Sequence, residues 1–338
     1  MAGDSDANDE ASVWWNTAKN DNAWWHSFAR AIVTSGPVSL HFISTEMICS
    51  SCGKTFNRDV VLFYVPYHIA FVMDGNRRFA KTHHLGHVIN GHEKGFQQLA
   101  KILEWCQDLG VLEVTVYAFS IENFKRTSEE VDGLMKLAEE KFSRLLAEKV
   151  KLEEKQISFR FFGNIAMLSP RLRKLIAQIQ LLTKDYNKGV VNVCMPYTSR
   201  DEIARGFELI RKGREKGLLE ETQISEWLVS RCLDSRLGTY PDMLIRTSGE
   251  KRLSDFLLWQ CSSSHIYFDD VLWPEFNYWH LCKAILSYQY HCSTIQEIQQ
   301  RIEANEPSTE ERLALEPFLE YVEELHNSAL HDFACLEI

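Results

Sequence analysis

The sequence lacks the long apolar segments of membrane-spanning helices. No run reaches the about 18 apolar residues that crossing a bilayer requires, and the most apolar stretch, Val60 to Met73, is interrupted by Pro66 and His68. The N-terminus is acidic and polar, unlike a secretory signal. We therefore expect any membrane contact to be peripheral.

Positive net charge is also missing. The 338 residues carry a formal net charge of −10 with a pI near 5.7, which argues against general nucleic-acid binding. Neither a Walker loop nor a dinucleotide fingerprint occurs, so nucleotide phosphates are disfavoured as ligands. The length suits one large α/β domain or two small ones.

The nine cysteines show no disulfide framework, and their odd number indicates a reducing compartment. One Cys-x-x-Cys pair, Cys49 and Cys52, could form half of a zinc site. Because no second pair follows at zinc-finger spacing, a surface insertion is the favoured interpretation.

Composition divides the chain into four segments. Residues 1–37 hold an acidic tail and a tryptophan-rich amphipathic helix, which suits an interfacial membrane anchor or a helix packed on protein equally well. Residues 38–65 are an insertion, either a lineage-specific loop or translated intron. Residues 66–292 form the main domain, and 293–338 a C-terminal helical hairpin.

Strand and helix patterns alternate through the main domain. Apolar residues recur at helical spacing in 96–106, 134–145 and 172–182, and Thr127 with Glu130 and Ser199 with Glu202 read as capping boxes. Strands separated by helices imply a mostly parallel sheet with helices on its faces. Six strands are expected, at 68–73, 113–119, 157–162, 190–195, 243–246 and 265–268.

Three polar clusters follow the first, second and fifth of these strands: Asp74 to Arg78, Ser120 to Arg126, and Arg246 to Ser254. In a parallel sheet they would meet beyond the carboxyl ends of the strands, where open α/β folds bind ligands. Each cluster alone could be a solvated turn. Three at equivalent strand ends favour a shared crevice.

The composition of the clusters points to phosphate. Arginine forks match phosphate oxygens, and several guanidinium groups in one cleft need an anion. Gly75 and Gly249 permit close backbone approach. Asp74, the only carboxylate of the first cluster, suits Mg²⁺, which one or two carboxylates and phosphate oxygens often hold. The arginines concerned are Arg77, Arg78, Arg126, Arg246 and Arg252.

Three long motifs resemble signatures of the cis-prenyltransferases. They are His68 to Ala80, Tyr117 to Arg126, and Ile245 to Gln260, and the similarity runs from about Pro66 to Tyr290. The resemblance implies the cis-prenyltransferase fold, a single α/β domain that is not a Rossmann fold. It also implies addition of isopentenyl diphosphate to an allylic diphosphate such as farnesyl diphosphate, one cis unit per cycle.

The family's functional positions carry over residue by residue. Asp74 would carry the Mg²⁺–diphosphate, and Asp74, Asn76 and Asn123 match positions associated with catalysis, as does Ser120. The allylic diphosphate would be held by Gly75, Arg77, Arg78, His92 and Arg126. Isopentenyl diphosphate would be held by Arg126, Arg246, Arg252 and Ser254.

Three positions depart from the family pattern, and the first favours the eukaryotic, dehydrodolichyl diphosphate-forming branch. Bacterial relatives have a glutamate, implicated in Mg²⁺ binding, where this chain has His265; eukaryotic catalytic subunits also lack it. Val88 replaces a usual basic residue four positions before His92. The sequence ends Cys335-Leu336-Glu337-Ile338, without the Arg-x-Gly end of self-sufficient members. We therefore expect a heteromer in which a Nogo-B-receptor-like subunit supplies that motif.

The resemblance implies a catalytic subunit on the cytoplasmic face of the endoplasmic reticulum, making the dolichol precursor used in protein glycosylation. A non-catalytic scaffold subunit is disfavoured because Asp74, Arg78 and Arg252 are retained. A self-sufficient bacterial-type homodimer is disfavoured by the C-terminus and His265. A phosphate-binding regulatory module would bind ligand without turnover.

Overall fold

A computed structural model of the chain describes residues 64–337. The tryptophan-rich helix, the Cys49–Cys52 pair and nearly all of the 38–65 insertion lie outside the described residues, so those predictions are not addressed by it.

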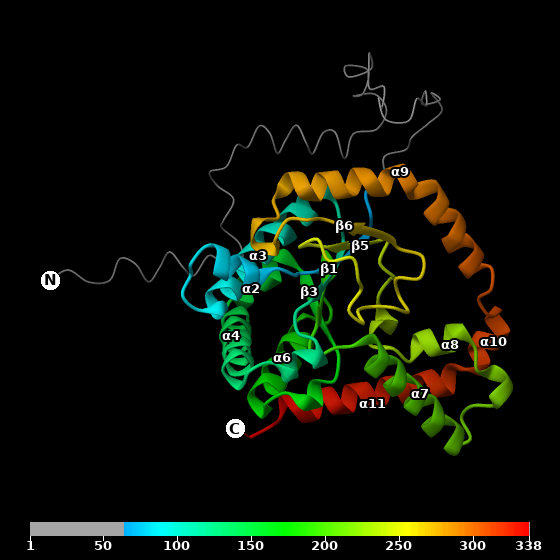
Figure 1. The fold of residues 1–338 in the computed structure, drawn as a ribbon. Coiled ribbons are helices and arrows are strands. Elements are labelled where there is room, and N and C mark those ends of the chain that lie inside the picture. The colour runs from blue at the N-terminus through cyan, green and yellow to red at the C-terminus, as the bar shows by residue number, and fades with distance from the viewer. Residues whose placement is uncertain (1–63, 338) are drawn as a thin grey trace, which may run out of the picture.

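The described chain folds around one six-stranded sheet with the order β3-β4-β2-β1-β5-β6, in which every pairing is parallel (Figure 1). This order confirms the predicted parallel sheet and differs from the Rossmann order. All six strands fall where the sequence predicts them. They are β1 His68–Val72, β2 Glu113–Tyr117, β3 Ile157–Phe162, β4 Gly189–Cys194, β5 Met243–Arg246 and β6 His265–Phe268.

Helices cover both faces of the sheet because the strands are buried on both sides. Alternate strand residues serve different cores. Ile69 and Phe71 face the core built with α3, α4, α6 and α9, while Ala70 and Val72 face a smaller core closed by residues 253–261. The helices are α2 Asn76–Thr82, α3 Val88–Leu109, α4 Ser128–Ala147, α5 Lys149–Lys155, α6 Pro170–Thr183, α7 Ser199–Glu215, α8 Glu226–Arg231, α9 Tyr278–Glu303, α10 Thr309–Ala314 and α11 Glu316–Ala334.

Helix caps follow the sequence with one shift. Thr127 caps α4, its hydroxyl accepting from the Glu130 N–H at 3.4 Å. The prediction that Ser199 caps the helix now identified as α7 is wrong by one residue. Thr198 is the N-cap of α7 and accepts from the Asp201 N–H, while Ser199 is the first helical residue.

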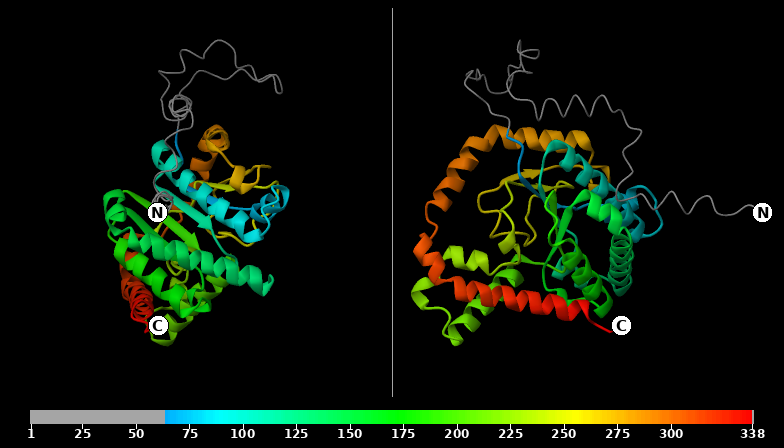
Figure 2. Two further views of the ribbon diagram at one scale, coloured as in Figure 1. Left: turned by 90° about the vertical axis from the view of Figure 1, so that its left-hand side faces the viewer. Right: turned by 180° about the vertical axis from the view of Figure 1, so that it is seen from behind.

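The C-terminal extension is helical, as predicted, but it is not a hairpin. Helix α9 runs without a break through residue 293 and lies along β6 (Figure 1). Helix α11 instead returns on the opposite side of the molecule and packs on α6 and α7 (Figure 2). Phe318 and Val322 bury this contact, so burial of apolar area on the core, rather than pairing with α9, positions α11.

Candidate active site

Asp74 is held rigidly two residues beyond the end of β1. Its carbonyl oxygen accepts from the Thr247 hydroxyl at 2.8 Å and from the Trp273 N–H at 3.0 Å. One carboxylate oxygen accepts from the Gly75 N–H at 2.7 Å. The chain can turn here because Gly75 has a φ of 108° and its α-carbon faces Leu272, which an added Cβ would approach to 2.9 Å.

Arg246 joins the first and third polar clusters. This buried side chain at the end of β5 donates to Asp74 Oδ2 at 3.0 Å and to Ser254 Oγ at 2.8 Å, and it also donates to the Arg252 carbonyl. Burial acts to raise the pKa of Asp74, but the hydrogen bond and charge of Arg246 outweigh it and hold that pKa below its usual value. Asp74 is therefore an ionised carboxylate at neutral pH.

Arg78 and Arg252 reach this centre less directly. Arg78 lies 3.9 Å from the Asp74 carboxylate and 3.6 Å from Glu250, and it donates to the Ser248 hydroxyl. The Arg252 guanidinium pairs with Glu250 and points outward, with its side chain 61% exposed. Arg252 contacts Arg246 through its carbonyl oxygen alone. The Arg252 guanidinium would therefore have to turn toward Asp74 to bind a ligand there.

A second group of cations gathers around Glu130. Arg126 donates to its carboxylate at 2.7 Å, while Arg77 and His92 each approach it to 3.9 Å. Burial, followed by the neighbouring Arg126 charge, lowers the pKa of His92 to about 4, so its ring is neutral. Burial also lowers the pKa of Arg126.

Sequence reasoning missed the carboxylates that compensate these arginines. Glu130 was visible only as a capping residue, although it lies in the first turn of α4, four residues after Arg126. Glu250 lay inside a named cluster without a role. The cations therefore do not stand without counter-charge, and a diphosphate would displace or share these carboxylates.

The two asparagines and Ser120 have local structural partners. Asn76 donates to the Met73 carbonyl at 3.3 Å, and its side-chain oxygen is buried without a hydrogen bond. Gly95 of α3 makes room for that oxygen, because an added Cβ would lie 2.2 Å from it. Asn123 accepts from the Ser120 N–H at 3.0 Å and closes the short helix η3, Ile121–Lys125. Their catalytic roles stay predictions.

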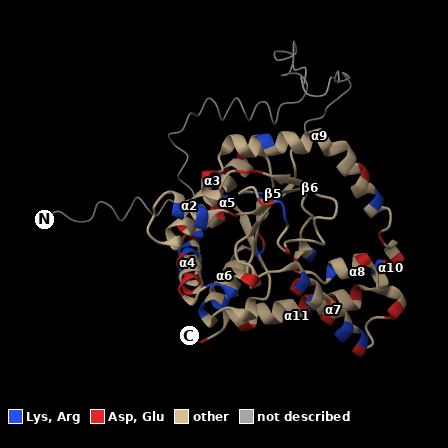
Figure 3. Ribbon diagram, viewed as in Figure 1, with Lys and Arg blue, Asp and Glu red and all other residues tan. Residues whose placement is uncertain are grey.

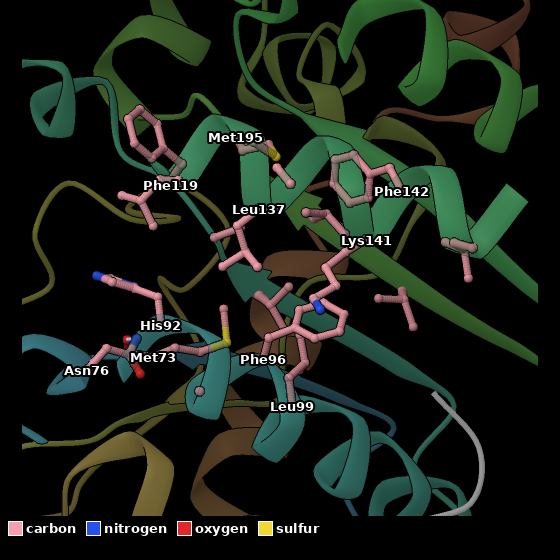
Figure 4. A pocket seen from close by; sticks show the side chains of 18 of the residues that line it. Met73, Asn76, His92, Phe96, Leu99, Phe119, Leu137, Lys141, Phe142 and Met195 are labelled. Carbon is pink, nitrogen blue, oxygen red and sulfur yellow. Dashed lines mark hydrogen bonds between the residues drawn. The ribbon is translucent and has the colours of Figure 1, made fainter. Parts of the chain in front are cut away.

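An apolar cavity opens beside Asn76 and His92 (Figure 4). It lies between α3, α4 and the sheet and has a volume of about 140 Å³. Helices α3 and α4, which follow Arg78 and Arg126 in the chain, provide its walls. Its lining includes Phe96, Leu99 and Leu103 of α3, Leu134, Ala138 and Phe142 of α4, and Val116, Val191 and Val193 of the sheet.

His265 and Val88 lie away from the Asp74 carboxylate. His265 is at the amino end of β6, where it pairs with Met243, whereas Arg246 pairs with Phe268 at the other end. Its ring contacts the Ser287 hydroxyl at 3.0 Å and stacks on His291. Val88 begins α3, one turn before His92.

The donor set around Asp74 fits a divalent cation shared with phosphates. No group of three His, Cys, Asp or Glu side chains suited to holding a metal by itself occurs among residues 64–337. Asp74 is ionised, its carboxylate is partly exposed, and arginines flank it. A single carboxylate with phosphate oxygens is a usual Mg²⁺ environment, so these residues suit a metal that arrives with a diphosphate.

Comparison with known proteins places this site in a family. The family model described as putative undecaprenyl diphosphate synthase matches residues 72–295. A dehydrodolichyl diphosphate synthase complex subunit of Homo sapiens is 53% identical over 233 residues, covering 69% of this chain and 70% of the human protein. A complex subunit of the same description from Schizosaccharomyces pombe is 41% identical, covering 67% of this chain and 85% of that protein.

Solved structures show the same architecture. Lavandulyl diphosphate synthase from Lavandula x intermedia, crystallised with dimethylallyl diphosphate, superposes with a TM-score of 0.63 at 30% identity, over 67% of this chain and 95% of that one. A probable undecaprenyl diphosphate synthase from Campylobacter jejuni gives 0.54 at 29% identity, over 66% and 95%. With its parallel sheet, the arginines around Asp74 and these matches, the chain belongs to the undecaprenyl diphosphate synthase family, the cis-prenyltransferases.

Proposed function

We propose that this chain extends farnesyl diphosphate with isopentenyl diphosphate in the cis configuration, as the catalytic subunit of a heteromeric dehydrodolichyl diphosphate synthase. One arrangement carries the proposal. Two arginine-bearing walls adjoin Asp74 through Arg246 and Arg78, and a largely apolar cavity opens beside Asn76 and His92. Two diphosphates and a growing hydrocarbon chain require these three compartments together. The names of the human, yeast and plant relatives support the dehydrodolichyl product.

The roles follow the two walls. Arg77, Arg78, Gly75 and His92 bind the allylic diphosphate, beside the cavity that receives its hydrocarbon tail. Arg246, Arg252 and Ser254 bind isopentenyl diphosphate. Arg126 lies with the allylic wall, against Glu130, and serves both substrates in the proposal.

Asp74 holds Mg²⁺ together with diphosphate oxygens. When bound, the ion stabilises the charge that develops on the leaving diphosphate as the allylic C–O bond breaks. The protein's own contribution is to keep Asp74 ionised through Arg246 and to present arginine donors to both diphosphates. Asn76, Ser120 and Asn123 are proposed to orient the reacting groups.

A partner subunit completes the site in this proposal. Helix α9 carries few charges along most of its length (Figure 3), and Trp279, Leu286 and Tyr290 expose 48%, 41% and 65% of their surface. Ile266 of the edge strand β6 is also exposed. Apolar surface of this kind marks protein interfaces, and we assign it to a Nogo-B-receptor-like subunit. The printed names of the human and mouse relatives describe complex subunits.

We place the enzyme peripherally on the cytoplasmic face of the endoplasmic reticulum, where a dolichol precursor for protein glycosylation would be needed. None of the helices within residues 64–337 combines the length and hydrophobicity that a membrane span requires. Flotation of liposomes with the full chain and with a variant lacking residues 12–33 tests membrane binding through the tryptophan-rich segment.

The decisive assay combines the full chain with farnesyl diphosphate, radiolabelled isopentenyl diphosphate and Mg²⁺, with and without the candidate partner. We expect long-chain polyprenyl diphosphate, strongly dependent on the partner. Absence of polyprenyl product in the presence of the partner would refute the enzymatic proposal, and equal product without it would refute the heteromer.

A further inference from the structure

The loop that carries Ser254 has an unusual backbone. Ser254, Asp255 and Leu257 have φ values of 52°, 59° and 45°, in the left-handed region that side chains other than glycine disfavour. Such conformations persist only where surrounding contacts fix them. The loop therefore needs anchors outside the arginine cluster that it serves.

Asp255 provides the main anchor, and it does so from the side away from Arg246. Its carbonyl oxygen accepts from the Ser199 N–H at 2.7 Å. Its carboxylate accepts from the Arg200 N–H at 3.1 Å and from Arg200 Nε at 2.8 Å. Asp255 thereby satisfies free N–H groups in the first turn of α7, a favourable place for a carboxylate.

Two further contacts close the clamp. The Ser199 hydroxyl accepts from the Leu258 N–H at 2.9 Å, and the Tyr117 hydroxyl of β2 lies between two carbonyl oxygens, 3.0 Å from that of Tyr197 and 3.3 Å from that of Ser254. The Tyr117 ring stacks on Phe256, with centroids 4.4 Å apart. These contacts hold the loop that carries Ser254 against both α7 and β2.

We propose that Asp255 is a positioning residue for isopentenyl diphosphate. By binding the first turn of α7 it fixes the left-handed turn that puts the Ser254 hydroxyl and the Arg252 carbonyl against Arg246. Asp255 is itself engaged by Arg200 and acts through Ser254. This inference rests on the proposed function, because it assumes that Ser254 and Arg246 bind that substrate.

The experiment compares steady-state kinetics of the full chain with its partner for Asp255→Ala, Asp255→Asn and the exposed control Asp185→Ala. Asp255→Ala removes the carboxylate and favours ordinary φ values, so the KM for isopentenyl diphosphate should rise about tenfold. The KM for farnesyl diphosphate should stay within about twofold. Asparagine keeps an acceptor for the Arg200 N–H and tolerates a left-handed φ, so it should recover most of the affinity.

A purely structural role would give a different pattern. If Asp255→Ala lowers thermal stability and shifts both KM values alike, or shifts neither, the positioning role is wrong. Arg252→Ala, measured alongside, separates this result from the site assignment. A normal KM for isopentenyl diphosphate in that variant would contradict the assignment of Arg252, whereas a raised KM there with no change in Asp255→Ala would overturn the positioning role alone.

Discussion

The two walls of the crevice are built differently. On the side proposed to bind isopentenyl diphosphate, Arg246 is buried, only 2% exposed, and its side chain donates to Asp74, Ser254 and the Arg252 carbonyl. On the allylic side, Arg77 and His92 stand 3.9 Å from Glu130 without a close hydrogen bond to it. Preformed donors lower the cost of binding one small, invariant substrate. Looser pairs can adjust as the allylic substrate lengthens in every cycle.

Asp74 belongs to both walls, so its loss should have the largest effect. Asp74→Ala removes the Mg²⁺ ligand and leaves the buried Arg246 without its carboxylate, and turnover should fall about a thousandfold. Product formation from labelled isopentenyl diphosphate measures it. Near-full activity would remove Asp74 from the proposed role. Asp185→Ala is the matched surface control.

The sequence predicted this meeting of walls because periodicity and strand-end chemistry are local signals. The six strands followed from the hydrophobic pattern. The proximity of Asp74 to Arg246, and of Arg246 to Ser254, followed from the polar clusters at the ends of those strands. The roles of individual residues came from motif resemblance alone and stay predictions.

What the sequence could not give depends on side-chain direction and long-range packing. Glu130 becomes the partner of Arg77 and His92 only because α2 and α3 approach it in the folded chain. The packing of α11 on α7 depends on Phe318 finding room beside Gly213, where an added Cβ would lie 2.3 Å from its ring. No local pattern encodes either contact.

His92 makes the stability of the fold depend on pH through the allylic wall, whereas the residues assigned to the isopentenyl wall include no histidine. Its folded pKa of about 4 lies below the 6.5 of a free histidine. Between these values the unfolded chain binds a proton that the folded chain does not, so stability falls as pH falls. From pH 7.5 to 5.0 this amounts to about 2 kcal/mol.

Urea unfolding of the full chain at these two pH values tests the prediction. His92→Gln should lose less stability than the parent chain over the same interval, while the exposed control His331→Gln should behave like the parent. Identical pH dependence in the parent and His92→Gln would mean that His92 is charged in the folded chain.

Arg77 and Arg252 form a matched pair across the crevice, with side chains 55% and 61% exposed. If the walls serve different substrates, Arg252→Ala should raise the KM for isopentenyl diphosphate about tenfold and Arg77→Ala that for farnesyl diphosphate about tenfold. Each variant is the control for the other in the same kinetic assay. Equal effects on both substrates would show that the two walls act as one site.

The smallest effect is expected where the allylic wall continues into the cavity. Lys141 is the charged side chain that lines the apolar part of this space between α3 and α4, and it is 7% exposed. Its ammonium lies 3.0 Å from Glu140, 3.7 Å from Glu93 of α3, and over the Phe96 ring. In the proposed function an elongating hydrocarbon would pass this cation, and apolar groups gain nothing from contact with a charge that stays hydrated or paired.

Lys141→Met keeps a long flexible stem and makes the wall continuously apolar. We expect the product distribution to move toward longer chains, with the KM for both diphosphates within about twofold of the parent. Chromatography of labelled polyprenols measures it, and Lys136→Met, at an exposed position of the same helix, is the control. An unchanged distribution, or the same shift in Lys136→Met, would exclude Lys141 from setting chain length. A shift confined to Lys141→Met would instead separate the two functions of the allylic side, because its arginines would govern diphosphate affinity and its cavity wall the length of the chain.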